Sequence, residues 1–519
     1  MTEPLVAIIG AGPVGVTTAT LLAQYGIHSV ILERWKGVYP QPRAVHLDDE
    51  VYRIIERLGI GAEFAAISRP ALGLRLLAPD FTVLAEFHRD PTNTRHGHPA
   101  ANMFHQPTFE ALLRANLQRY PEATLQVGAE VTGLTDIGGG RTRIAFSDRT
   151  DDTEHTVVCD YLLGCDGANS LVRRYIGARM RDLRFAQRWL VIDIDSAVEL
   201  DQWPGVHQVC NPHRAGTFMQ CAGSHYRWEF RLLPGETAAD FGTVEALRPL
   251  IDPWLGSTTN EELRMRRVAE YTFRAQVADH WRRGGTFLLG DAAHLTPPFI
   301  GQGLCAGMRD AMNLSWKLAG VLNGSLPTDV LDTYQRERKP HAVAMIALAL
   351  AIGYSMTAGG RLGDAIRRLV VPRAPLIPGL AAKVVDSATP RLTRSRLVER
   401  RRGRKDLAGS LCPNALTTSG ERFDSICGKG FSVVTSVHPA QSQLALIERR
   451  HAVVHYAAPS TPLARWLARG SATAAIVRPD FTVMQMGRDL RQLCRALPSF
   501  DSDVKTTTRD GGVRFGPLD

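Results

Sequence analysis

Three glycines near the start of the chain have the spacing of a dinucleotide-binding turn. Gly10, Gly12 and Gly15 (GAGPVG) follow an apolar run that predicts a strand, and a helical pattern begins directly after them. Glycine at these positions permits a tight turn, close approach of the backbone to a pyrophosphate and close packing of the helix on the sheet. The N–H groups at the helix start suit phosphates, and the carboxylate of Glu33, which ends the next predicted strand, suits ribose hydroxyls. This pattern predicts a dinucleotide site without choosing between NAD and FAD.

A second motif, residues 290–303 (GDAAHLTPPFIGQG), favours a flavin. It follows the apolar run TFLL, so the Asp291 carboxylate ends a predicted strand and can accept a hydrogen bond from a ribityl hydroxyl. The loop and the helix start after it can present N–H groups to the electron-rich pyrimidine edge of the ring. Between the two motifs, Asp166 and Gly167 lie in a predicted strand and basic turn at 160–174 (DYLLGCDGANSLVRR).

Other residues near these motifs have a structural interpretation beside a functional one. His294 could act as a base near the flavin, and it could equally be a structural histidine bonded to its own loop. His46, Asp48 and Asp49 are interpreted as a helix start, because Asp is favoured in the first turn. Trp228 and Phe230 could line a substrate pocket, but aromatic alternation in a strand more often forms core.

The elements that must position these residues follow from the hydrophobic periodicity. The opening strand, glycine turn, helix and second strand form a βαβ unit, whose parallel strands need a crossover helix. Helical patterns run over 43–58 and 108–117, and the glycines at 138–140 separate two alternating segments as a hairpin turn would. Residues 188–271 change to short alternating strands with few long helices, which predicts an inserted sheet.

The length of the chain allows two or three domains around a large main core. We predict a FAD-binding domain over 1–180 and 281–340, a substrate-binding sheet domain over 181–280, a helical segment and linker over 341–400, and a C-terminal domain over 405–519. The last segment has its own strand-like runs and a closing helix, and about one hundred residues suffice for an independent core.

Composition and charge exclude several classes of protein. With 44% hydrophobic and 22% charged residues over 519 positions, the chain is neither fibrous nor disordered overall. Part of the net charge of +9 comes from the arginine-rich run 394–405. We interpret this run as a solvated helix end or linker and expect no nucleic-acid partner, because no aromatic platform accompanies it. Eight scattered cysteines without a CxxC pair or zinc-like Cys/His spacing predict no metal site and a reduced, cytoplasmic protein.

One apolar run, residues 342–356, is shorter than the ~20 residues that span a bilayer, so we predict a buried helix and no membrane span. Its neighbour at 362–371 (LGDAIRRLVV) has a basic, amphipathic pattern, which leaves a helix lying on a membrane surface as an alternative. The first predicted strand begins close to Met1 without the pattern of a signal peptide, so export is not expected.

The three motifs, in this order and spacing, resemble the single-component aromatic hydroxylases of the para-hydroxybenzoate hydroxylase type over about residues 5–340. The sequence is similar in particular to the 3-(3-hydroxyphenyl)propionate hydroxylases, through RWLVIDID at 188–195, RWEF at 227–230 and an appended C-terminal domain. The resemblance implies the α/β class, with a Rossmann-like FAD-binding domain, an inserted β-sheet substrate domain, a helical segment and a C-terminal thioredoxin-like domain. Because that last domain has no CxxC, we predict for it a structural or oligomerisation role, such as a homodimer contact.

The resemblance also implies which residues contact the cofactor: Gly10, Gly12, Gly15, Glu33, Arg34, Arg43, Gln106, Asp166, Gly167, Asp291, Gly301, Gln302, Gly303 and Cys305. Arg34 matches a residue close to the adenosine, and Arg43 matches one near the pyrophosphate, where a bidentate cation is suitable. Gln106 matches a glutamine that contacts the flavin and its phosphates. Asp166 and Gly167 match a motif linked to both FAD and NAD(P)H.

The loop before the second helix start has further implied roles. Residues 301–303 match the loop that faces the flavin ring, and Pro298 matches a proline whose backbone carbonyl can point at the substrate hydroxyl. No catalytic residue is assigned firmly, and only Pro298 and His294 are considered for a direct role. Where the family usually has Asn, this chain has Cys305, which leaves a backbone contact to the flavin but no strong side-chain hydrogen bond.

The resemblance implies a monooxygenase that hydroxylates a phenolic ring, with non-covalently bound FAD, NADH or NADPH as co-substrate, and O2. In such enzymes a flavin C4a-hydroperoxide transfers the oxygen, and exclusion of water prevents its decay to H2O2. The sequence leaves the substrate open between a 3-(3-hydroxyphenyl)propionate-like acid and a polyketide phenol. A flavin-dependent epoxidase, a halogenase or a non-catalytic flavin-binding interaction protein are the alternatives, and the absence of a WxWxIP segment disfavours the halogenase.

Overall fold

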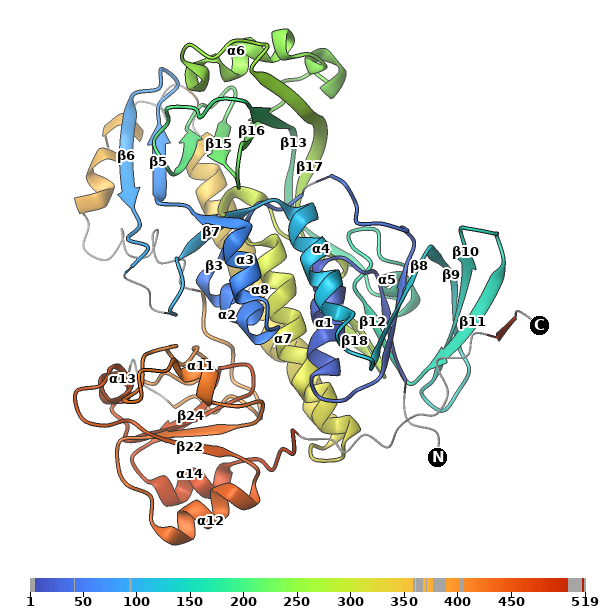
Figure 1. Cartoon of the computed structure of the whole chain (residues 1–519), viewed down its shortest axis with the longest axis vertical. Coiled ribbons are helices and arrows are strands. Elements are labelled where there is room, and N and C mark those ends of the chain that lie inside the picture. Colours follow the sequence, from blue (N-terminus) through green and yellow to red (C-terminus); the bar gives the residue numbers. More distant parts are fainter. Residues whose placement is uncertain are drawn as a thin grey trace.

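The computed structural model describes residues 5–41, 43–92, 96–357, 360, 367–369, 371–376, 389–401, 405–502 and 516–517. The described parts follow one another along the long axis of the molecule (Figure 1). A parallel sheet with its helices lies in the middle. A second sheet lies at one end, and a C-terminal unit lies at the other.

The central sheet is parallel over most of its width, in the order β18-β19-β12-β1-β2-β8. Its strands are β1 (Val6–Ile9), β2 (Ser29–Glu33), β8 (Ala123–Val127), β12 (Tyr161–Gly164), β18 (Arg282–Arg283) and β19 (Thr286–Leu288). Every residue of β1 and β2 is buried, which explains why these strands read as nearly continuous apolar runs. Helix α1 (Pro13–Ala23) connects the parallel pair β1 and β2, so the predicted βαβ unit is confirmed.

The helices of this middle part are α2 (Asp49–Arg57), α3 (Gly61–Ala66), α4 (Gln106–Leu117), α5 (Leu171–Tyr175), α7 (Gly303–Leu322) and α8 (Asp332–Thr357). Helix α7 is buried along most of its length, and the apolar stripe predicted for it is confirmed because Ala311, Leu314 and Leu318 have no exposed surface. It packs closely on α1 at Gly307, where a Cβ atom would lie 2.5 Å from Cγ2 of Val14.

The helix predicted over residues 43–58 is wrong at its start. The chain before α2 enters a small sheet made of β3 (His46–Asp48), β7 (Ala101–Phe104) and β4 (Ser68–Pro70). The Asp48 carboxylate then caps α2, because it accepts a hydrogen bond from the N–H of Val51 at 2.9 Å. The interpretation as a helix start is therefore confirmed for Asp48 and Asp49, but it is wrong for His46, which pairs with β7 as the first residue of β3.

The hairpin predicted around residues 138–140 is also confirmed. The glycines join β9 (Ala129–Asp136) to β10 (Thr142–Asp148), and β10 pairs further with β11 (Glu154–Cys159). All three glycines have positive φ, a conformation that glycine adopts without strain. The short strand β25 (Gly516–Pro517) pairs with β11.

The second sheet has the order β20-β17-β13-β16-β15-β14-β5-β6. Its strands are β5 (Gly73–Leu77), β6 (Val83–His88), β13 (Met180–Ser196), β14 (Val206–Val209), β15 (Gly216–Gln220), β16 (His225–Arg231), β17 (Leu263–Ala278) and β20 (His294–Leu295). The predicted substrate domain over 181–280 leaves out β5 and β6, which join the sheet because β5 pairs in parallel with β14. Trp228 and Phe230 pack in the core beneath α6 (Val244–Leu255), so their interpretation as core residues is confirmed.

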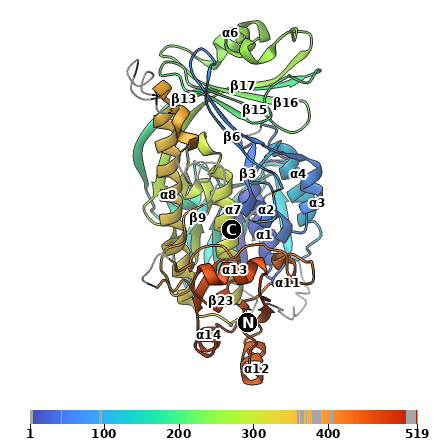
Figure 2. The ribbon, with the colours of Figure 1, turned by 90° about the vertical axis from the view of Figure 1, so that its left-hand side faces the viewer.

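The C-terminal unit has its own sheet, in the order β22-β21-β23-β24 (Figure 2). Its elements are α11 (Phe423–Ile426), β21 (Ser432–Thr435), α12 (Gln441–Arg449), β22 (Val453–Tyr456), α13 (Pro462–Arg469), β23 (Ala474–Val477), β24 (Val483–Gly487) and α14 (Leu490–Ala496). Strands β21 and β22 are parallel, whereas β23 runs antiparallel to both β21 and β24. Helix α12 connects the parallel pair.

A network of buried charges joins this unit to α7 and α8, and we call the contact the seam. Lys317 donates a hydrogen bond to Glu337 at 2.8 Å, and Arg478 pairs with Glu337 at 3.0 Å. Arg478 also pairs with Asp480, and Asn313 donates to the carboxylates of Glu337 and Asp480. Two buried cations and two buried carboxylates therefore compensate one another, as buried charges require.

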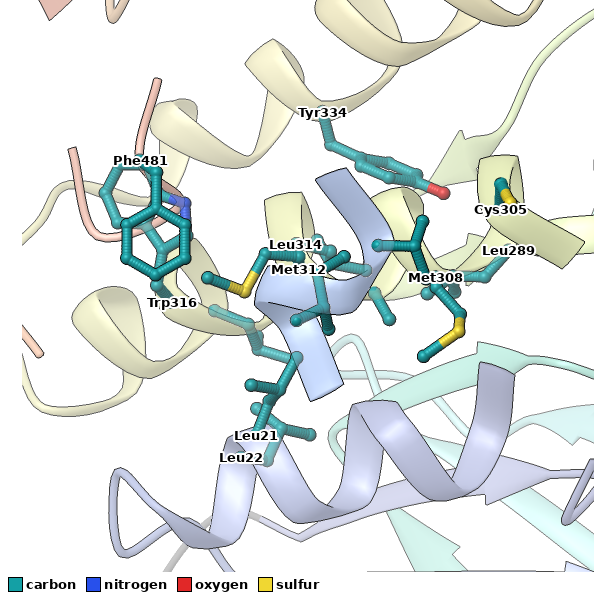
Figure 3. Packing of buried hydrophobic residues seen from close by; sticks show 14 of the residues in the cluster. Leu21, Leu22, Leu289, Cys305, Met308, Met312, Leu314, Trp316, Tyr334 and Phe481 are labelled. Carbon is teal, nitrogen blue, oxygen red and sulfur yellow. The ribbon is translucent and has the colours of Figure 1, made fainter. Parts of the chain in front are cut away.

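A second buried arginine crosses the seam in the opposite direction. Arg53 of α2 donates through Nε and Nη2 to the Asp424 carboxylate, at 2.6 Å in each case, and through Nη1 to the carbonyl of Cys412. Its guanidinium also lies 4.5 Å from the ring centre of Phe481. The guanidinium of Arg478 likewise lies 5.3 Å from the ring centre of Trp316 of α7, so each of these two seam arginines faces an aromatic ring (rings labelled in Figure 3).

The apolar run 342–356 lies in α8, and the prediction of a buried helix holds for one face only. Ile346 and Ala349 are buried, whereas Val343 and Tyr354 are exposed. By length and composition this helix is apolar enough to cross a membrane, but 39% of its apolar window is buried inside the protein. Most of the amphipathic run predicted at 362–371 lies outside the described residues.

Candidate cofactor site

The glycine turn at the start of α1 is packed too tightly for a side chain at Gly10 and Gly15. Gly10 has a φ of +98°, and a Cβ atom there would lie 2.5 Å from the carbonyl oxygen of Cys165. A Cβ atom at Gly15 would lie 2.0 Å from the carbonyl oxygen of Gly10. At Gly12 the nearest protein atom would be 3.8 Å away, so the space beside this residue is free for a ligand.

The start of α1 offers its backbone N–H groups to that space. Gly12 is the N-cap residue, and no side chain caps the helix. The Glu33 carboxylate lies beside the turn, where it accepts hydrogen bonds from the N–H groups of Ala11 at 2.7 Å and Trp35 at 2.9 Å. Arg34 follows on the exposed side, with its guanidinium 5.4 Å from the centre of the Trp35 ring.

The predicted pyrophosphate arginine is held through its backbone. Oε1 of Gln106 accepts hydrogen bonds from the N–H of Arg43 at 2.9 Å and of Ala44 at 2.6 Å. On the other side, the Arg43 carbonyl accepts a hydrogen bond from Nη1 of Arg227 at 3.0 Å. The Arg43 side chain is exposed and free to meet an anion, while its main chain is fixed by groups from α4 and β16.

A buried salt bridge in the second sheet holds Arg227. Nε and Nη2 of Arg227 donate to the two oxygens of Asp193 at 2.8 and 2.9 Å, and His225 bonds to the same carboxylate. Our sequence reasoning missed this contact because Arg227 alternates with the core residues Tyr226 and Trp228, a position that usually faces solvent. Only the RWLVIDID and RWEF motifs, which contain Asp193 and Arg227, hinted at it.

Asp166 and Gly167 form the turn after β12, next to the glycine turn. Oδ2 of Asp166 accepts hydrogen bonds from the N–H groups of Leu171 at 2.6 Å and Val172 at 3.1 Å. Its Oδ1 is buried without a partner among the described residues, and burial raises the pKa of this carboxyl. Gly167 has a φ of +76° and open space on its Cβ side. The turn thus leaves room for a ligand beside Cys165, whose carbonyl oxygen packs against Gly10.

Asp291 follows β19 at the edge of the central sheet. Its side chain is exposed to solvent, yet enough protein surrounds it that desolvation raises the pKa of its carboxyl, against the lowering effects of His294 and Arg43. Arg43 is close enough to act on Asp291 electrostatically, so the structure places the predicted pyrophosphate arginine near the predicted ribityl aspartate.

The loop at 301–303 presents backbone rather than side chains. Gly301 has a φ of +63°, and a Cβ atom there would lie 2.7 Å from Nδ1 of His46. The Gln302 side chain is buried behind the loop, where it donates to Asp48 at 2.8 Å and accepts from Arg309 at 3.1 Å. Burial of Gln302 therefore leaves the backbone of this loop for contact with a flavin.

Cys305 is fully buried one turn into α7, with Sγ 3.8 Å from the Gly301 carbonyl oxygen. Burial raises the pKa of its thiol, so the side chain is a neutral packing group. Figure 3 shows Cys305 near Leu289 and Met308 among the apolar side chains around α7. Cys305 thus supports the loop from behind.

His294 has the environment of a structural histidine. It has no exposed surface, and its Nε2 lies 2.8 Å from Oδ2 of Asp310, whose Oδ1 accepts a hydrogen bond from Nε of Arg338. Asp310 also accepts from the N–H of Gly290, which fixes the turn before Asp291. The Pro298 carbonyl accepts a hydrogen bond from the N–H of Gly301 at 2.8 Å and keeps a second lone pair.

The structure thus brings the predicted cofactor residues to one region at the carboxyl ends of β1, β2, β12 and β19. The open glycine turn, the unpartnered Oδ1 of Asp166 and the exposed carboxylate of Asp291 fit a dinucleotide that carries a ribityl chain. Among the described residues, no group of three or more His, Cys, Asp or Glu side chains could hold a metal ion.

Comparison with known proteins agrees with this geometry. The sequence matches the FAD binding domain family over residues 3–349. It is 34% identical over 436 residues to a 3-(3-hydroxy-phenyl)propionate/3-hydroxycinnamic acid hydroxylase of Burkholderia cenocepacia, which covers 83% of this chain and 78% of the relative.

The chain belongs to the FAD-binding monooxygenases.

A second relative of this monooxygenase matches almost end to end. A probable NADH-specific resorcinol 4-hydroxylase of Rhodococcus jostii is 31% identical over 508 residues, which cover 94% of this chain and 93% of the relative. Two solved structures share the fold over 95% of this chain and 98% of theirs: aklavinone-11 hydroxylase with FAD and aklavinone, at a TM-score of 0.78 and 23% identity, and the flavin-dependent monooxygenase PieE, at 0.79 and 22%. The appended C-terminal unit is thus part of a fold seen in other proteins.

In this monooxygenase, aromatic rings gather where the second sheet meets the loop before α7. The ring of Phe299 lies 5.7 Å from those of Phe185 and Trp189, and Phe273 stacks on Trp189 at 5.4 Å. Nε2 of Gln208 donates to the Phe299 carbonyl, while its buried Oε1 has no partner among the described residues. This junction offers an apolar wall with one free polar acceptor.

Proposed function

We propose that this monooxygenase hydroxylates a phenolic ring, with non-covalently bound FAD, NADH or NADPH as co-substrate, and O2. The observation that carries the proposal is that the turn at Gly12 has open space beside it, and that the exposed carboxylate of Asp291 lies within electrostatic reach of Arg43. Bound FAD supplies the redox chemistry, which no protein side chain can perform. The chain supplies binding, orientation and exclusion of water.

Each part of this cofactor region has one role in binding FAD. The N–H groups at the start of α1 and the guanidinium of Arg43 bind the pyrophosphate. Glu33 exchanges its backbone partners for ribose hydroxyls, and Asp291 accepts a hydrogen bond from the ribityl chain. The backbone N–H groups of residues 301–303 face the pyrimidine edge of the ring, and the buried Gln302 side chain holds them in place.

The substrate lies between that loop and the second sheet. The rings of Phe299 and Trp189 provide an apolar wall, and the free lone pair of the Pro298 carbonyl accepts a hydrogen bond from the phenol. The relatives act on 3-(3-hydroxyphenyl)propionate and resorcinol by name, so we propose a substituted phenol of that size, and a polyketide phenol is the larger candidate. NAD(P)H binds transiently, since the sequence has a single dinucleotide fingerprint.

We further propose that the C-terminal unit is a thioredoxin-like domain with a structural role. The strand order β22-β21-β23-β24, with a parallel first pair and an antiparallel second pair, supports this assignment. Its cysteines Cys412, Cys427 and Cys494 are buried and free, and burial raises the pKa of each thiol. Such thiols react slowly, which supports a role without redox turnover.

Purification and a phenol screen test the proposed function. We expect a yellow protein whose NAD(P)H consumption rises with a suitable phenol and whose product gains one oxygen atom by mass. The Asp291→Ala variant should lose FAD, whereas Asp332→Ala, an exposed carboxylate in the first turn of α8, should retain it. A wild-type protein that stays colourless in excess FAD would refute the cofactor assignment, and FAD binding without oxygen transfer to any phenol would refute the reaction.

A further inference from the structure

A cavity of about 80 Å³ lies in the seam, behind the flavin-facing loops. Its walls come from α2, α7 and α8 on one side and from the C-terminal unit on the other. The lining includes Glu50, Arg309, Arg338, His341, Ser410 and Asp480. A polar cavity of this size has room for several waters or for a small ion.

The carboxylates in the wall are already neutralised. Glu50 accepts hydrogen bonds from Nε of Arg309 at 3.0 Å and from Nη2 at 2.8 Å, and Thr389 adds its hydroxyl. Asp480 pairs with Arg478, which is buried in the seam. Neither carboxylate is left to attract a cation into the cavity.

Two donors in the wall are not fully used. Arg338 is 2% exposed and donates from Nε to Asp310 and from Nη2 to the Ala306 carbonyl, but its Nη1 has no acceptor among the described residues. His341, one turn further along α8, is 4% exposed, and its buried Nδ1 is also without a partner there. The Nη1–H groups of Arg338 can donate to a group in the cavity, and His341 can donate to the same group in the tautomer that carries its proton on Nδ1, so this corner is suited to a group that accepts hydrogen bonds.

The electrostatic environment of the corner is positive. Burial lowers the pKa of His341 well below its ordinary value, and the charges of Arg338, Arg309 and His294 lower it further. No carboxylate is among the groups that act on this imidazole. The Asp310 charge is shared by Arg338, His294 and the N–H of Gly290. An acceptor that carries negative charge therefore fits better than water.

We propose that the seam cavity binds a small anion, of the size of a halide or formate, between Arg338 and His341. The anion would touch the arginine that holds Asp310, and Asp310 fixes the turn before Asp291. Two side chains, Arg338 and Asp310, therefore lie between this site and the turn before Asp291. The proposal concerns this cavity alone and does not depend on the proposed reaction.

Bromide locates the site directly, because its anomalous scattering identifies it in crystals of the holoenzyme. We expect an anomalous peak inside the seam cavity in contact with Arg338 and His341. Peaks confined to the protein surface would mean an adventitious ion only and would overturn the proposal. This test needs no variant, so it decides the question even where a substituted protein fails to fold.

Chloride NMR tests the same site in solution. Exchange with a protein site broadens the chloride signal, and we expect excess broadening with the wild-type holoenzyme. His341→Phe and Ser410→Leu fill the cavity from opposite walls and should remove that excess. Arg336→Gln, which deletes an exposed cation from the same helix, should leave it unchanged. Equal broadening by wild type and by a folded cavity variant would overturn the proposal.

Discussion

The glycine turn and the seam hold charge by opposite means. At the turn, consecutive residues leave backbone N–H groups open for an anion that comes from outside. At the seam, Lys317, Glu337, Arg478 and Asp480 come from distant parts of the chain and satisfy one another. The turn is rigid because nothing larger than glycine fits at Gly10 and Gly15, and the seam is rigid because its buried charges need one another as partners. A ligand site can therefore be formed by neighbouring residues in the sequence, whereas a contact between domains is formed by residues from several separate segments.

The largest expected effect is at the turn. Gly15→Ala places a Cβ atom 2.0 Å from a backbone oxygen that cannot move aside, so we expect at least ~3 kcal/mol of strain and a colourless protein. Absorbance at the flavin band after dialysis against FAD measures the loss. Gly12→Ala is the matched control, because its Cβ atom meets no protein atom within 3.8 Å. It should fold normally and bind FAD about tenfold more weakly, a difference of ~1.4 kcal/mol. Equal FAD binding by the two variants would contradict the prediction that a Cβ atom at Gly15 clashes with the protein, whereas one at Gly12 clashes only with the bound FAD.

The seam should respond to loss of one charge. Arg478→Met leaves the Asp480 carboxylate without its cation and leaves Glu337 with Lys317 alone, and breaking a buried pair in this way costs about 3–5 kcal/mol. Urea unfolding of the holoenzyme measures the free energy. Arg396→Met breaks the exposed pair with Asp329 and should cost no more than ~1 kcal/mol. Similar losses of unfolding free energy in the two variants would show that the buried charges of the seam stabilise the protein no more than an exposed ion pair does.

Gln106 combines features of the turn and the seam, because its side chain holds the backbone of the cofactor site through hydrogen bonds from a distant part of the chain. Gln106→Leu removes the acceptor for the N–H groups of Arg43 and Ala44 and should weaken FAD binding about tenfold, with little change in stability. Titration of the apoprotein with FAD measures the affinity. The control is Gln118→Leu at the exposed end of the same helix, which should bind FAD as the wild type does. An unchanged affinity in Gln106→Leu would mean that Arg43 does not need this support.

The last effect depends on pH. Glu110 lies near Gly12, and burial raises the pKa of its carboxyl from 4.5 to about 7. Between these values the folded protein keeps a proton that the unfolded chain releases, so the free energy of unfolding falls as the pH rises through this window. Glu110→Gln should remove that fall and gain up to ~3 kcal/mol above pH 7, because each pH unit of the window is worth about 1.4 kcal/mol. Urea unfolding from pH 4 to 8 tests it, with the exposed Glu63→Gln as control. Parallel curves for Glu110→Gln and wild type would contradict the prediction.

Sequence reasoning succeeded where neighbouring residues decide the outcome. The βαβ unit, the hairpin at 138–140 and the helix start at Asp48 depend on local spacing, and the structure has all three. The predicted helix start at residue 43 failed because pairing with β7 keeps that stretch extended. The membership of β5 and β6 in the second sheet was also missed, since a parallel pairing with β14 across more than one hundred residues leaves no local pattern.

The candidate site followed the same rule. The glycines, Glu33 and Asp291 could be assigned from motifs, and the structure brings them to one region, although their contacts with FAD stay a prediction. The buried direction of the Gln302 side chain could not be read from sequence, because it depends on Asp48 and Arg309, which belong to other elements. Long-range side-chain partners are what a single sequence conceals.

Helix α7 has a practical consequence for engineering. Its first turn supports the loop at 301–303, and its far end carries Asn313 and Lys317 into the seam, so one rod of about 30 Å connects the two regions. A shortened gene that stops before residue 389 would leave the Lys317–Glu337 pair and the Trp316 ring without the C-terminal unit that covers them. A chimera that exchanges C-terminal units between relatives would have to exchange the matching α7 and α8 side chains with them.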